Sequence, residues 1–139
     1  MKTAFVAAAL LLILAVAPAA ADRLAGSEVF LCSPAQAVRC WMDGECESGP
    51  PWTWNIPDFI RFDLGAGMIR TTRSSGEARE SPIGTVERSE GLIAVQGYEH
   101  GRAVSIVISE ETGLASMAMA MEGSTVTAFG ACTPLDKEE

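Results

Sequence analysis

The stretch that decides the fold is AVSIVISEETGLASMAMAMEGSTVTAFGAC, residues 103–132. It contains three apolar runs, at 103–109, 114–121 and 125–132, which are separated by short glycine-containing turns. Apolar and small or polar residues alternate along the runs, which is the period of a strand with one buried face. Strands joined by turns this short must pair as antiparallel neighbours, because a parallel pair needs a crossover of a dozen residues or more.

The same pattern continues towards the N-terminus. Residues 92–98, 83–88, 68–72, 59–64 and 27–32 each predict a strand, which brings the number of candidate strands to eight. We therefore expect a mainly β fold, an antiparallel meander that forms a small barrel or half-barrel, with a β-sandwich as the alternative. The N-terminal segment is expected to cover an edge of this sheet.

The remaining segments have other local signals. Ser33 and Pro34 resemble an N-cap and first turn, so the sequence predicts one short helix from Pro34 to about Trp41. Residues 42–51 consist of turn-forming residues, and residues 73–80 predict a polar loop. Residues 133–139 predict a frayed, charged tail.

The N-terminus has the three parts of a secretory signal. Lys2 supplies positive charge, residues 4–17 are an unbroken apolar run, and Pro18 precedes the small residues 19–21. The run is shorter than the roughly 20 residues of a membrane-spanning helix, which favours cleavage over retention as an anchor. We therefore predict a signal at residues 1–21, a single domain at 22–139, and export to a periplasm or to the medium.

Charge excludes several classes of partner. Without residues 1–21 the chain has 118 residues and one basic residue fewer, because Lys2 is removed. It then contains 18 acidic and nine basic residues. A formal charge of −9, with the arginines scattered, argues against binding to nucleic acid or to anionic membrane surfaces. After cleavage of the signal, no stretch is long and apolar enough to span a membrane.

Four cysteines, Cys32, Cys40, Cys46 and Cys132, occur in this exported chain, which predicts two disulfides. Their spacing contains no C-x-x-C pair, so neither a zinc site nor a redox motif is expected. Three pairings are open, and we favour Cys40–Cys46 with Cys32–Cys132. The second bridge would join the first and last strands and close a long loop.

Catalytic residues are sparse. His100 is the single histidine and sits in a predicted turn, without a nucleophile nearby in the sequence. Glu99 and Glu122 fall on alternate turns of the meander and so lie at the same end, where a carboxylate pair could bind a cation or act in acid–base chemistry. Surface charge explains them equally well, and we predict no catalytic residue, metal site or cofactor.

Two groups of side chains are candidates for binding. Met117, Met119 and Met121 point to one face of a strand, as core filler, as the lining of a barrel, or as thioether ligands for Cu(I). Trp41, Trp52 and Trp54 gather around the proline-rich segment 50–51, where exposed rings could dock a partner. The function we favour is a non-catalytic exported module that binds a protein or a small apolar ligand. A small hydrolase or lyase using paired carboxylates and a Cu(I)-binding protein are the alternatives.

Overall fold

The computed structural model describes residues 24–135. The predicted signal, residues 1–21, lies outside this range, as do residues 136–139 at the end of the predicted tail. The described chain forms ten strands and two short 3-10 turns: β1 (Val29–Trp41), β2 (Cys46–Gly49), η1 (Pro51–Trp54), β3 (Ile60–Asp63), β4 (Met68–Thr71), η2 (Arg73–Ser75), β5 (Arg79–Pro82), β6 (Thr85–Ser89), β7 (Leu92–Glu99), β8 (Arg102–Ser109), β9 (Leu114–Met121) and β10 (Ser124–Pro134).

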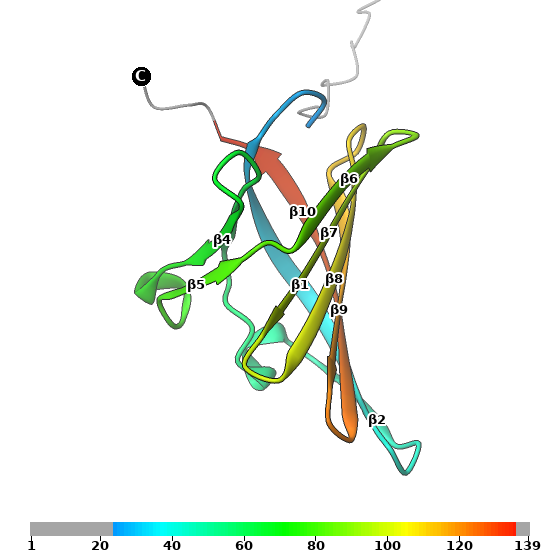
Figure 1. The fold of residues 1–139 in the computed structure, drawn as a ribbon. Coiled ribbons are helices and arrows are strands. Elements are labelled where there is room, and N and C mark those ends of the chain that lie inside the picture. Colours follow the sequence, from blue (N-terminus) through cyan, green and yellow to red (C-terminus); the bar gives the residue numbers. More distant parts are fainter. Residues whose placement is uncertain (1–23, 136–139) are drawn as a thin grey trace, which may run out of the picture.

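All ten strands belong to one antiparallel sheet, which confirms the prediction of a mainly β half-barrel. Nine of them follow the order β5-β4-β3-β1-β10-β9-β8-β7-β6, and β2 pairs separately with β1. Figure 1 shows the sheet curving so that β4 and β5 stand on one side and β6 to β9 on the other. Apart from the pairing of β1 with β10, neighbouring strands follow one another in the chain or are separated only by β2. The sheet is therefore a meander whose first and last strands join.

Strand β1 is the centre of the sheet and not an edge cover. On one side it pairs along its length with β10, from Phe30 opposite Pro134 to Trp41 opposite Ser124. On the other side β3 pairs with residues 29–32 and β2 pairs with residues 37–40. Two different strands thus share one flank of β1, and a gap at residues 33–36 separates them.

The predicted helix from Pro34 to Trp41 is wrong, because these residues belong to β1. Pro34 has no N–H to give to a ladder, and it sits where the flank of β1 opposite β10 is unpaired. The pairing with β10 shifts between Pro34 and Gln36, which is a bulge. Tertiary pairing on both sides therefore overrides the local Ser-Pro signal.

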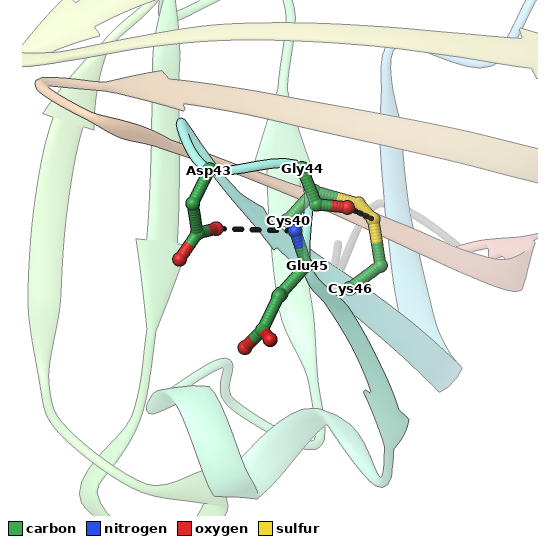
Figure 2. The surroundings of a disulfide bond; sticks show 5 residues. All are labelled: Cys40, Asp43, Gly44, Glu45 and Cys46. Carbon is green, nitrogen blue, oxygen red and sulfur yellow. Dashed lines mark hydrogen bonds between the residues drawn. A yellow bond between two sulfur atoms is a disulfide. The ribbon is translucent and has the colours of Figure 1, made fainter.

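Two short strands were not predicted. β2 lies within residues 42–51, and the Asp43 carboxylate accepts a hydrogen bond from the Glu45 N–H in the turn that precedes it (Figure 2). β5 lies at the end of the predicted polar loop and pairs with β4. Strand β10 also extends to Pro134, so Thr133 and Pro134 belong to the sheet and not to a tail.

The core lies on the concave side of the half-barrel. Phe30 and Phe62 face each other across β1 and β3 with ring centroids 5.1 Å apart, and both are fully buried. Leu24 is also fully buried, and its N–H donates to the carbonyl of Glu110 at 2.9 Å. The segment before β1 therefore closes one end of the half-barrel, next to the β8–β9 turn.

Both predicted disulfides form, and each joins residues that stand directly opposite on paired strands. Cys32–Cys132 links β1 to β10 and is buried, with a sequence separation of 100. Cys40–Cys46 links β1 to β2 with a separation of 6, and Figure 2 shows it beside the turn at Asp43 to Glu45. No helix long and apolar enough to cross a membrane occurs within residues 24–135.

The two disulfides are expected to contribute unequally to stability. In the chain-entropy model, bridges with these separations are worth about 4.7 kcal/mol for Cys32–Cys132 and about 2.4 kcal/mol for Cys40–Cys46. Urea unfolding of Cys32→Ala/Cys132→Ala should therefore show a free energy of unfolding about 2 kcal/mol lower than that of Cys40→Ala/Cys46→Ala. Equal losses, or a larger loss for the second pair, would contradict this view of the fold.

Gly130 is expected to be irreplaceable because β1 bulges towards it. A Cβ at this position would lie 2.2 Å from the Ser33 carbonyl oxygen and 2.8 Å from the Pro34 Cα, both of them backbone atoms. Gly130→Ala should therefore lower the free energy of unfolding by more than about 2 kcal/mol. The control is Gly26→Ala, which meets no atom within 4 Å but has a φ of +77°. Gly26→Ala should lower the free energy of unfolding by only about 1–2 kcal/mol, because alanine is strained at a positive φ.

Candidate functional site

The half-barrel is incomplete along one seam. The chain passes directly from β5 into β6 through Ile83 and Gly84, yet β5 pairs with β4 and β6 pairs with β7. At this crossing the Gly84 N–H donates to the Gln96 carbonyl at 2.8 Å, so the two sides of the sheet meet there. Between β5 and the last residues of β7 the structure has no strand pairing among residues 24–135.

A cleft of 620 Å³ opens where the two sides separate. This volume falls within the roughly 300–1,000 Å³ of small-molecule sites. The cleft lies at the end of the half-barrel opposite Leu24 and is formed by β5, the β7–β8 hairpin and the segment after η1. The lower half of Figure 1 shows β5 standing apart from that hairpin.

The floor of the cleft is apolar. It is made by inward-facing side chains of both sides of the sheet and by the residues that follow η1: Ile56, Pro57, Ile60, Ile69, Val104, Ile106, Met117, Met119, Val126 and Ala128. Each strand contributes alternate residues, because successive side chains of a strand point to opposite faces.

The mouth of the cleft is charged. Glu77 forms a salt bridge with Arg79, whose Nε donates to the carboxylate at 2.9 Å. Glu80 forms a salt bridge with Arg70 at 3.1 Å. Glu99 accepts a hydrogen bond from the Ser81 hydroxyl, which links β7 to β5 across the seam.

Arg79 holds Glu77 in its ionised form. Its hydrogen bond and positive charge lower the pKa of Glu77 below 4.5, with smaller contributions from the side chains of Asn55 and Arg102. These four residues come from the segment after η1, the strand β5 with its preceding loop, and the β7–β8 hairpin. The mouth therefore carries an electrostatic cluster that three separate segments build together.

Arg102 is the cation of this cluster without a salt bridge of its own within the described chain. It lines the cleft at the start of β8, and its side chain is half-buried. Its electrostatic neighbour is Glu77, whose carboxylate is already bound by Arg79. A positive charge at the mouth thus remains available to a group outside the chain.

The predicted methionine residues divide between cleft and core. Met117 is buried and Met119 is half-buried, and both line the cleft. Met121 packs against the core but does not line the cleft. Their partners on β8 and β10 are Ile106, Val104, Val126, Ala128 and Ser124, so the methionine sulfurs lie mostly among hydrocarbon.

The predicted tryptophan residues do not line the cleft. Trp41 lies under the Arg39 guanidinium, 5.2 Å from the ring centroid, and Trp54 is half-buried against the core next to Gly49. Trp52 is 70% exposed. The chain that follows them, Asn55 to Pro57, is what reaches the cleft.

His100 and Glu122 lie where the turns were predicted. His100 has a φ of +47° and forms a two-residue turn with Gly101, and its Nδ1 lies 3.0 Å from Glu99. Glu122 does not line the cleft, so Glu99 and Glu122 are not brought together in it. Among residues 24–135 no group of three or more His, Cys, Asp or Glu side chains could hold a metal ion.

The cluster of Glu77, Arg79 and Arg102 was missed by sequence reasoning. Two of its members fall in the segment expected to be a polar loop, and Arg102 follows a predicted turn. The charged residues Glu77, Arg79 and Glu80 hint at an ion-pair cluster in this segment. The local sequence does not show that these residues lie near Arg102.

Comparison with known proteins adds no family to this description. No protein-family model matches the chain, and no curated protein sequence is similar enough to count as a relative.

Proposed function

We propose that this protein is an exported, non-catalytic binding module for a small amphipathic ligand. The apolar body of the ligand would occupy the cleft between the two sides of the half-barrel, and an anionic head would lie at the mouth beside Arg102. The observation that carries the proposal is the 620 Å³ cleft with an apolar floor and a charged mouth.

The floor favours an apolar body. Its side chains are branched or flexible aliphatics and methionines, which adapt to irregular hydrocarbon shapes. Burial of apolar surface contributes about 25 cal/mol per Å², so an aliphatic chain seated on this floor would gain most of its affinity from burial.

The mouth favours an anionic head. Arg79 and Arg70 are engaged by Glu77 and Glu80, whereas Arg102 forms no salt bridge with any residue of 24–135. A guanidinium presents donors that match a carboxylate, sulfonate or phosphate group. A charge at the edge of an apolar cleft fixes the orientation of a ligand more than it adds to affinity.

The pairing of Glu77 and Glu80 with arginines favours a binding role over general acid catalysis. General acid catalysis requires a carboxyl group that stays protonated near neutral pH. Glu77 is held ionised by Arg79, and Glu80 is paired with Arg70. Glu99 is engaged by Ser81 and lies beside His100.

Export rests on two features. The two disulfides are compatible with an oxidising compartment outside the cytosol. The first 21 residues have the order of charge, apolar run and small residues that a signal peptidase recognises.

Export predicts that the mature protein begins at Asp22. N-terminal sequencing of protein recovered from the periplasm or medium of an expressing bacterium measures this start. Ile13→Arg interrupts the apolar run and should leave the chain in the cytoplasm with reduced thiols. Thr3→Arg adds the same charge before the run and should be exported normally. Mature protein that retains Met1 would contradict the proposal.

Ligand binding is tested with anilinonaphthalene sulfonate, an apolar fluorophore with an anionic head, and with decanoate, decanol and decylamine as competitors. We expect decanoate to displace the probe at the lowest concentration. Arg102→Gln should lower the affinity for decanoate by about five- to tenfold, which corresponds to about 1–1.4 kcal/mol of binding free energy. The affinity for decanol should not change. Arg61→Gln, an arginine outside the cleft, is the matched control.

A second variant tests the place of binding. Val104→Trp fills the cleft from a half-buried position and should abolish binding of the probe. Thr85→Trp puts the same ring at an exposed position outside the cleft and should not. Unchanged binding in folded Val104→Trp would show that the cleft is not the site. Tighter binding of decylamine than of decanoate would reject the anionic head.

A further inference from the structure

The convex face of β7 to β10 lacks charged side chains, a feature that it shares with the outward positions of the adjoining strand β1. Its outward positions are alternate residues of Leu92–Tyr98, Ala103–Ser109, Leu114–Ala120 and Thr125–Ala131, and none of them is charged. Residues 22–139 nevertheless hold 18 acidic and nine basic residues, close to one position in four. Solvated sheet faces ordinarily carry such charges.

This face is exposed and partly apolar. Leu114 is 64% exposed, Phe129 49%, Leu92 44% and Val107 41%. Single exposed apolar side chains are ordinary, but these belong to four adjacent strands and to neighbouring registers. A contiguous apolar patch of this kind marks a surface that another molecule covers.

The relief of the face divides it into two halves. Towards the β8–β9 turn it carries the large side chains of Leu114, Phe129 and Val107. Towards the other end, β8 to β10 present only small side chains, with Ala118 and Ala120 at the centre on β9. The large side chain at that end is Tyr98 on the outer strand β7, which is 71% exposed. Consider a two-fold axis that runs parallel to the face and across the strands, at the level between Ser116 and Ala118. Rotation about it would set the large half of one copy on the small half of the other.

From this we infer that the convex face of β7 to β10 binds a second copy of the same chain in a two-fold symmetric dimer. An isologous interface must be complementary to itself, and the division into a large and a small half has that property. Charge points the same way. Two copies with a formal charge of −9 each repel one another at acidic surfaces, and this face brings no charges into contact.

The available area fits a modest interface. Four strands spaced about 4.8 Å apart, each spanning seven residues at about 3.4 Å per residue, give a face of about 19 by 24 Å. The side chains add relief to this projected area of about 450 Å². This face is therefore no larger than the smallest specific interfaces, which bury roughly 600 Å² per partner. The dimer should accordingly dissociate on dilution.

Sedimentation velocity of the mature chain tests the inference over roughly 1 to 500 µM, a range suited to an interface of this size. We expect a concentration-dependent shift from monomer to dimer. Because the contact excludes charge while the remaining surfaces repel, raising the salt concentration should favour the dimer. A chain that remains monomeric throughout this range would overturn the inference.

Two matched variants identify the face. Ala118→Arg places a charge at the centre of the small half and should leave the chain monomeric at every concentration. Ala66→Arg makes the same substitution at an exposed turn between β3 and β4 and should associate like the wild type. Association that survives Ala118→Arg would overturn the inference. Ala118 points away from the cleft, so probe binding should persist in Ala118→Arg, and the two proposals can fail separately.

Discussion

The pairing of β1 with β10 is the constraint on which the rest of the structure depends. Most other neighbouring strands form hairpins, and β1 and β3 are separated by the end of β1, by β2 and by η1. The β1–β10 ladder instead closes a loop of about 100 residues, which carries the largest entropic cost in the fold. Three features offset this cost: the longest ladder of the sheet, the buried Cys32–Cys132 bridge, and Gly130, which lets the bulged strand β1 approach closely.

The position of the cleft follows from that join. The two sides of the sheet curve away from β1 and β10. They meet again where Ile83 and Gly84 carry the chain across and where the Ser81 hydroxyl donates to Glu99. One end of the space between the two sides is closed by Leu24, and salt bridging of Arg88 to Glu110 at 2.6 Å reinforces that end. The other end stays open, so the cleft is a consequence of an incomplete barrel and needs no dedicated sequence motif.

The sequence predicts the parts of this fold that depend on local pattern. All eight expected strands are present, since their alternation and glycine turns are local signals. The disulfide pairing was also predictable, because Cys32 and Cys132 end the first and last apolar runs. Segment 34–41 was not, since its conformation is decided by β10 and β2 on either side. The same holds for the cleft, because Glu77 and Arg102 are 25 positions apart and only the curvature of the sheet brings them together.

Alternation along β8 and β9 gives the two proposed surfaces separate sets of residues. Val104, Met117 and Met119 face the cleft, while Ala118 and Val107 lie on the convex face of the same strands. A sheet covered by helices would have to bury its convex face, and a solvated one would carry charge there. This sheet does neither, although charged residues are frequent at its turns and at the mouth of the cleft. The absence of charge extends over the convex side of β7 to β10 and of the adjoining strand β1, which is consistent with the proposed contact surface.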